Sequence, residues 1–130
     1  GVMRHFSQLG LSSLPEFAPT RSLRVDIITF GLSDEIWIVE CKSGKTDFKS
    51  DNKWYGYLDW CDRYFWAVDR EFPVDILPSD TGLIIADPYD ASILREAPLN
   101  KLSVVRRKKL MKLIAKTACG RLLAHSDPRM

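Results

Sequence analysis

The sequence predicts an α/β fold in which a mixed β-sheet is flanked by helices. Short runs rich in β-branched and aromatic residues, typical of strands, follow one another along the chain. Two of these runs, Arg24–Phe30 and Ile36–Lys42, are separated by five residues, a length that β-hairpins commonly use. Helical segments precede, interrupt and follow the runs, and this alternation is typical of the α/β class.

Composition limits the classes of protein to which the chain can belong. Its 130 residues suit one domain, which we place at 1–130, and 45% hydrophobic with 28% charged residues is ordinary for a globular protein. The net charge of +2 does not by itself require a polyanionic partner, and no apolar run approaches a membrane span, so we expect no membrane partner. Three widely spaced cysteines argue against a disulfide framework and suit a reducing cytoplasm.

The first elements are a short helix and an edge strand. Val2–Leu9 has the length of a short helix and ends at Gly10, a common residue just after a helix. Leu14–Phe17 is predicted to form the first strand, and Pro15 restricts it to an edge or an entry position.

The hairpin that follows brings two carboxylates together. If Phe30 pairs with Ile36, then Asp26 lies opposite Glu40, and the two-residue alternation places Asp26, Glu40 and Lys42 on one face. Like charges directly opposite one another destabilise a sheet. A divalent cation between the two carboxylates would remove this repulsion.

A structural interpretation of the same residues stays open. Arg24 lies diagonal to Glu40 and Lys42 lies diagonal to Asp26, so the four charges could neutralise one another as a salt-bridged quartet. The position of Glu40 and Lys42 favours a functional site over a structural quartet, because both lie at the end of a strand that is apolar on both sides. Functional groups of α/β folds gather at such strand ends.

A helix is predicted after this strand. The Gly44-Lys45-Thr46 triplet is not a phosphate-binding loop, because Val39 occupies the place of the earlier glycine, and we expect no nucleotide cofactor. The helix is predicted to begin at Thr46 or Asp47 and to run to about Asp59.

Two side chains of this helix could contact DNA phosphates. Lys53 and Tyr57 are four residues apart and share a face of the helix. The alternative is that Lys53 is a surface residue and that Tyr57 belongs to the core.

The rest of the chain continues the pattern. Strands are predicted at Arg63–Val68, Leu83–Ala86 and Ala91–Ala97, and a long helix from an N-cap at Asn100 or Ser103 to about Leu123. Its buried stripe is predicted to be Leu110, Leu113, Ile114, Thr117 and Ala118. Its basic residues are candidate DNA contacts, above all Arg106, Arg107 and Lys109, although a basic helix face is usually just solvated.

The carboxylate pair has the chemistry of a metal site. Mg²⁺ and Mn²⁺ prefer oxygen ligands, and Asp26, Glu40 and the backbone carbonyl of Cys41 could supply three. Such a metal can activate water for phosphodiester hydrolysis, and Lys42 could position that water or stabilise developing charge. The side chain of Cys41 should face away into the core, and Asp62 should be a cap or surface residue rather than a ligand.

Asp26 together with Glu40-Cys41-Lys42 resembles the D…E-x-K signature of the PD-(D/E)XK nuclease superfamily. More closely, the chain resembles the MmcB-type family of small bacterial DNA-repair proteins over most of its length. The matching segments are Arg24-Val25-Asp26, Trp37 to Ser43, Asp47-Phe48 with Asp51, Lys53-Trp54 and Tyr57, Cys61-Asp62-Arg63 with Ala67-Val68, Gly82-Leu83-Ile84 with Ala86-Asp87, and Leu94 to Pro98.

The resemblance implies a restriction-endonuclease-like core and metal-dependent cleavage of DNA during repair. Asp26 and Glu40 would be metal ligands and Lys42 the catalytic lysine. Lys53-x-x-x-Tyr57 resembles the Q-x-x-x-Y helix motif of some superfamily branches, with lysine in place of glutamine. Many superfamily members also carry an acid on the first helix, and Val2–Leu9 has none.

Three hypotheses follow from these residues. The leading one is a Mg²⁺- or Mn²⁺-dependent deoxyribonuclease, with an endonuclease favoured over an exonuclease. The second is an inactive nuclease-fold module that binds DNA or assembles a repair complex, and the third is a pure protein-interaction domain. The candidate partners are DNA, a second copy of the chain and other DNA-repair proteins.

Overall fold

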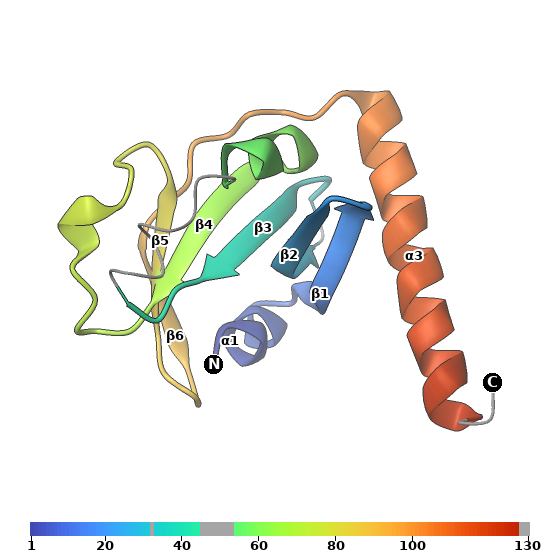
Figure 1. Ribbon diagram of the computed structural model, residues 1–130, viewed down its shortest axis with the longest axis horizontal. Coiled ribbons are helices and arrows are strands. Elements are labelled where there is room, and N and C mark those ends of the chain that lie inside the picture. The colour runs from blue at the N-terminus through green and yellow to red at the C-terminus, as the bar shows by residue number, and fades with distance from the viewer. Residues whose placement is uncertain (32, 45–53, 128–130) are drawn as a thin grey trace.

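The protein is built around a single mixed sheet, as the computed structural model in Figure 1 shows. The structure describes residues 1–31, 33–44 and 54–127. Within these residues the elements are α1 (Val2–Gln8), β1 (Ser12–Thr20), β2 (Leu23–Phe30), β3 (Ile36–Cys41), the 3-10 helix η1 (Trp54–Trp60), β4 (Arg63–Val68), the 3-10 turn η2 (Val74–Ile76), β5 (Gly82–Ala86), β6 (Ala91–Arg95) and α3 (Val104–Ser126).

The direction of the strands decides where a site can form. The six described strands follow the order β1-β2-β3-β4-β5-β6. Neighbouring strands are antiparallel from β1 to β3 and again between β5 and β6, whereas β3, β4 and β5 are parallel. The carboxyl ends of these three parallel strands therefore meet at one edge, the place where α/β folds gather functional groups.

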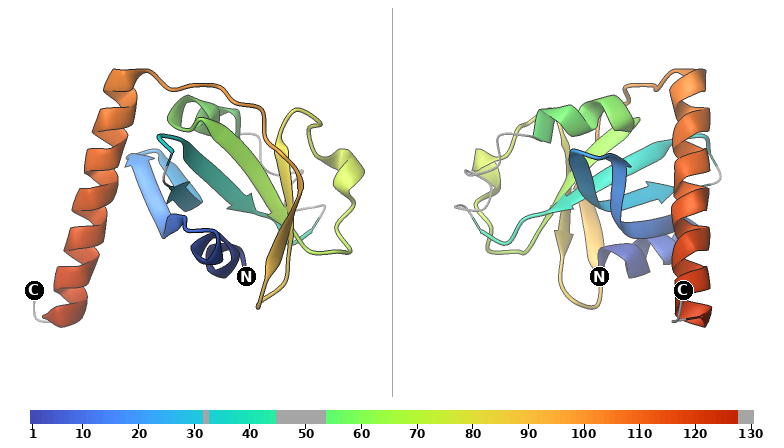
Figure 2. Two further views of the ribbon diagram at one scale, coloured as in Figure 1. Left: turned by 180° about the vertical axis from the view of Figure 1, so that it is seen from behind. Right: turned by 45° about the vertical axis from the view of Figure 1, so that its right-hand side comes forward.

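Helices cover both faces of the sheet, which confirms the predicted α/β class. On one face, Val2 and Phe6 of α1 pack in a buried cluster with Ile27, Val39 and residues of β4 and β5. On the other face, η1 and α3 contribute a second cluster whose fully buried members include Ile28, Ile38, Trp66 and Leu110. The sheet is thus the middle layer of three, and α3 stands beside β1 in Figures 1 and 2.

The hairpin between β2 and β3 has the predicted register. Phe30 pairs with Ile36 and Ile28 pairs with Ile38. The N-cap of α3 is Ser103, one of the two candidates, and its hydroxyl oxygen accepts a hydrogen bond from the backbone nitrogen of Arg106 at 3.1 Å. The first strand is longer than predicted and spans Ser12–Thr20.

Two predictions about the elements need correction. The described part of the expected helix at 46–59 is a 3-10 helix, Trp54–Trp60, in which Gly56 and the aromatic residues are poor helix formers and Trp54 packs against Tyr64 and Trp66. The expected start of that helix, with Asp51, lies outside the described residues. The last strand ends at Arg95, where the side chain turns to donate a hydrogen bond to the carbonyl of Thr81 at 2.8 Å.

The buried stripe of α3 is shorter than its periodicity predicts. Leu110 and Ile114 are buried, whereas Leu113 and Thr117 are half-buried and Ala118 is exposed. The second half of α3 lies along β1, to which Arg121 donates hydrogen bonds at the carbonyls of Pro15 and Glu16, without burying a further apolar side chain.

Candidate functional site

Asp26 and Glu40 lie side by side on β2 and β3, as the hairpin register predicts. The backbone nitrogen of Asp26 donates a hydrogen bond to Oε1 of Glu40 at 3.2 Å. In return, Oδ2 of Asp26 accepts a hydrogen bond from the backbone nitrogen of Cys41 at 2.8 Å. Each carboxyl group is therefore fixed to the strand that carries the other.

The environment of Glu40 is unusual for an acid. Only 5% of the residue is exposed, and it is paired across the sheet with the fully buried Trp66. Burial, and then hydrogen bonding and charge repulsion from Asp26, raise the pKa of Glu40 to about 9. In the absence of a cation, the two carboxyl groups share this site with Glu40 protonated at neutral pH.

These effects argue against the salt-bridged quartet. Lys42 lowers the pKa of Glu40, but its effect is the smallest of those that act on the group. A neutralising quartet would hold Glu40 ionised, because a nearby positive charge favours the carboxylate. Burial and Asp26 outweigh Lys42, and together these effects raise the pKa of Glu40.

Lys42 and Tyr57 are held by hydrogen bonds to the strands of the site or beside it. Lys42 follows the last residue of β3, and its backbone nitrogen donates a hydrogen bond to the carbonyl of Ala67 on β4 at 3.0 Å. The hydroxyl of Tyr57 donates a hydrogen bond to the carbonyl of Arg24 at 3.0 Å, two residues before Asp26. Tyr57 thus connects η1 to the strand that positions Asp26, whereas Lys53 lies outside the described residues.

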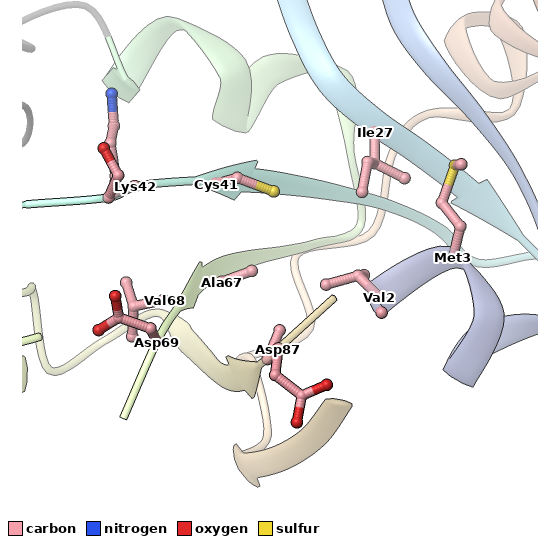
Figure 3. A pocket seen from close by; sticks show the side chains of 12 residues that line it. Val2, Met3, Ile27, Cys41, Lys42, Ala67, Val68, Asp69 and Asp87 are labelled. Carbon is pink, nitrogen blue, oxygen red and sulfur yellow. The ribbon is translucent and has the colours of Figure 1, made fainter. Parts of the chain in front are cut away.

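Cys41 faces away from the site, as predicted, but it does not belong to the core. The residue is exposed and lines a cavity of about 390 Å³ together with Met3 and Ile27. Figure 3 shows the sulfur of Cys41 and the side chain of Lys42 pointing in different directions. The protein atoms packed around the thiol raise the pKa of Cys41 to about 11, so it stays protonated at neutral pH and is a poor nucleophile.

Of the two roles predicted for Asp62, a cap or a surface residue, the surface position is wrong, because the residue is buried. It is 1% exposed and accepts hydrogen bonds from the backbone nitrogens of Ile36 at 2.6 Å and Leu102 at 2.9 Å. Arg107 adds two further bonds, at 2.5 and 2.7 Å. Burial alone would raise the pKa of Asp62, but these four hydrogen bonds outweigh burial and lower it.

The structure therefore gives Arg107 an internal partner and not a free guanidinium for phosphate. Because lysine keeps the charge but loses the two-pronged geometry, Arg107→Lys should lower the free energy of unfolding by about 1–2 kcal/mol. Chemical denaturation measures this change. DNA affinity should stay within twofold of the wild type, and a large loss of affinity with unchanged stability would show instead that Arg107 contacts DNA.

Arg106 and Arg107 lie at the far end of β3 from the carboxylates. The guanidinium of Arg106 stacks over the ring of Trp60 at 4.2 Å and donates to the carbonyl of Asp59 at 3.0 Å. Arg107 also donates to the carbonyl of Asp34, just before β3 begins. Six strand residues span about 17 Å, so the structure does not bring these two arginines to the Asp26–Lys42 site. Lys109 is exposed on α3.

Among the residues that the structure describes, Asp26 and Glu40 are the acids that meet at this site. Over residues 1–31, 33–44 and 54–127, no group of three or more His, Cys, Asp and Glu side chains converges in a metal-binding arrangement. The same residues contain no helix that is long and apolar enough to cross a membrane.

Fold and site together define an α/β protein with a paired-carboxylate site beside a lysine at the carboxyl edge of its parallel strands. The family model described as DNA repair protein MmcB-like matches residues 1–129, and the chain belongs to this MmcB-like family. The match indicates a role in DNA repair.

A solved structure extends this comparison. The SPO1766 protein of unknown function from Silicibacter pomeroyi is 54% identical, with a TM-score of 0.95 over 99% of this chain and 88% of that chain. A search of curated proteins found no match.

Proposed function

We propose that this protein is a Mg²⁺- or Mn²⁺-dependent DNA nuclease that acts in DNA repair. The observation that carries the proposal is the buried Glu40 held against Asp26 at the carboxyl edge of the parallel strands. A buried carboxyl group beside a second acid is costly for stability, and carboxyl groups with a strongly raised pKa such as Glu40 concentrate at functional sites.

The donor set fits a divalent cation of this kind. Mg²⁺ is usually bound through one or two carboxylates while it keeps several waters, and Asp26 with Glu40 supplies two adjacent hard oxygen donors. The carbonyl of Cys41 follows Glu40 directly and would be a third candidate ligand. When bound, the metal would supply an acidic water and an electrophile for phosphodiester hydrolysis.

The surrounding residues would position this chemistry. Lys42, immediately after β3, carries the positive charge that would hold the attacking water or stabilise charge developing on the phosphate. Tyr57 would keep the start of β2 in place through its bond to the Arg24 carbonyl.

Metal binding is the first test of the proposal. Titration calorimetry with Mn²⁺ should give one site in the wild type, and Asp26→Asn should weaken that site at least tenfold. The same substitution at Asp75, an exposed acid of η2, is the matched control and should bind like the wild type. Unchanged Mn²⁺ binding in Asp26→Asn would remove the metal from the proposal.

A DNA-binding module without catalytic activity is the second candidate. It is favoured by the absence of a third converging acid within the described residues. This candidate predicts salt-sensitive DNA binding with no cleavage of any DNA form, and it predicts that Lys42→Ala leaves the binding intact.

A further inference from the structure

The outward face of α3 has a strongly one-sided charge. The helix spans Val104–Ser126 and contains no acidic residue. Four of its lysines are exposed to solvent, and we call them the lysine face: Lys108, Lys109, Lys112 and Lys116. Lysines three and four positions apart on a helix repel each other, and this helix supplies no carboxylate of its own to offset them.

The arginines of the same helix have a different role. Arg106 stacks on Trp60, and Arg107 is bound to Asp62. Arg121 donates to the carbonyls of Pro15 at 2.5 Å and Glu16 at 2.6 Å and so ties the helix to β1. The arginines therefore attach α3 to the body of the protein, and the lysines point their charge outward.

The geometry presents these lysines as a short row. Eight residues separate Lys108 from Lys116, which corresponds to about 12 Å along the helix axis. Figures 1 and 2 show α3 at the side of the molecule, with its outer side turned away from the sheet. A straight, extended ligand with regularly spaced negative charge can follow such a row.

We propose that the lysine face binds the phosphate backbone of duplex DNA without reading its sequence. Lysine acts as a point charge towards phosphate, and contacts of this kind position a protein on DNA without specifying bases. Single-stranded DNA is held largely by stacking on aromatic side chains, and Val104–Ser126 contains no Phe, Trp or Tyr. A second copy docked on this face would bring lysine against lysine.

This surface deepens the proposed function, and it rests on the role in DNA repair and not on the cleavage chemistry. Binding is therefore measured in EDTA, where metal-dependent cleavage cannot occur. If the wild type binds duplex DNA but never cleaves it, the proposed nuclease activity is contradicted and the proposed DNA-binding surface is not. If the wild type cleaves DNA but its binding does not depend on these lysines, the proposed DNA-binding surface is contradicted and the nuclease activity is not.

The test compares two triple variants with equal loss of charge. In the first, Lys109, Lys112 and Lys116 become Gln; in the control, the exposed Arg4, Arg21 and Arg70 become Gln. Fluorescence anisotropy measures their affinity for a labelled duplex between about 50 and 200 mM salt. The lysine variant should bind at least tenfold more weakly, and its slope of log affinity against log salt should fall by about 2 to 3.

Two other results would contradict DNA binding by the lysine face. DNA binding by the lysine face is overturned if the duplex affinity of the lysine variant is within twofold of that of the wild type, or no weaker than that of the control variant. Binding of the wild type to anionic vesicles but not to duplex DNA overturns it as well. Circular dichroism checks folding, and the single charge reversal Lys116→Glu gives an independent variant, for which at least a threefold loss of duplex affinity is expected.

Discussion

Replacing Lys42 by alanine should lower metal-dependent DNA cleavage at least hundredfold and leave DNA affinity within about threefold. Asp26 and Glu40, which would hold the metal, stay in place in this variant because their hydrogen bonds run through the backbones of β2 and β3. The loss would therefore reflect the ammonium group itself. Removal of one positioned catalytic or charge-stabilising group typically lowers a rate by about 10²- to 10⁴-fold.

The measurement is a cleavage assay on supercoiled, linear, single-stranded and branched DNA, with Mg²⁺, Mn²⁺ or EDTA. Lys101→Ala is the matched control, because Lys101 is exposed and lies outside both the sheet and α3. A Lys42→Ala variant that cuts like the wild type would remove Lys42 from the chemistry. Wild type that cuts none of these substrates, but binds DNA, would favour the binding module.

The hairpin shows how much of the site could be predicted from sequence. A five-residue connection and the two-residue alternation of strands suffice to place Asp26 beside Glu40, and the observed pairing of Phe30 with Ile36 confirms that register. Local rules succeed here because both acids belong to neighbouring strands joined by a short loop.

Contacts between distant segments could not be predicted in this way. Asp62 and Arg107 are 45 residues apart, and neither lies in a motif that signals an ion pair. A buried carboxylate that accepts four hydrogen bonds depends on how the start of α3 docks on the sheet. The same docking separates the structural arginines of α3 from its exposed lysines, which sequence spacing alone treats as one basic run.

Cys41 illustrates a third kind of limit. Strand alternation correctly turns its side chain away from Glu40, but alternation cannot say whether the far face is filled. At the end of β3 that face is open, and α1 leaves a cavity beside Met3. The predicted side of the strand is confirmed, and the predicted burial is wrong.

The resemblance to the MmcB-type family is confirmed by the match over residues 1–129. The wider PD-(D/E)XK assignment, with its metal and its nuclease activity, stays a prediction. The carboxylate pair supports that assignment through its geometry and the burial of Glu40.

Replacing Glu40 by glutamine should stabilise the metal-free protein at about pH 8 by on the order of 3 kcal/mol, or about 10 °C in melting temperature. The folded chain keeps the Glu40 proton up to about pH 9, whereas the unfolded chain releases it near pH 4.5. Between these values the unfolded state binds fewer protons, so the stability of the wild type falls as pH rises. Glutamine cannot ionise, and the difference should vanish near about pH 4.

Thermal denaturation in EDTA across this range measures the effect, with Glu35→Gln as a control of opposite sign. The hydrogen bond from Arg63 lowers the pKa of Glu35, so the ionised group stabilises the fold at neutral pH and its replacement should destabilise it. Equal stability of wild type and Glu40→Gln at about pH 8 would mean that Glu40 is ionised without a metal. Saturating Mn²⁺ should stabilise the wild type more than Glu40→Gln, because only the wild type retains both carboxylates as ligands.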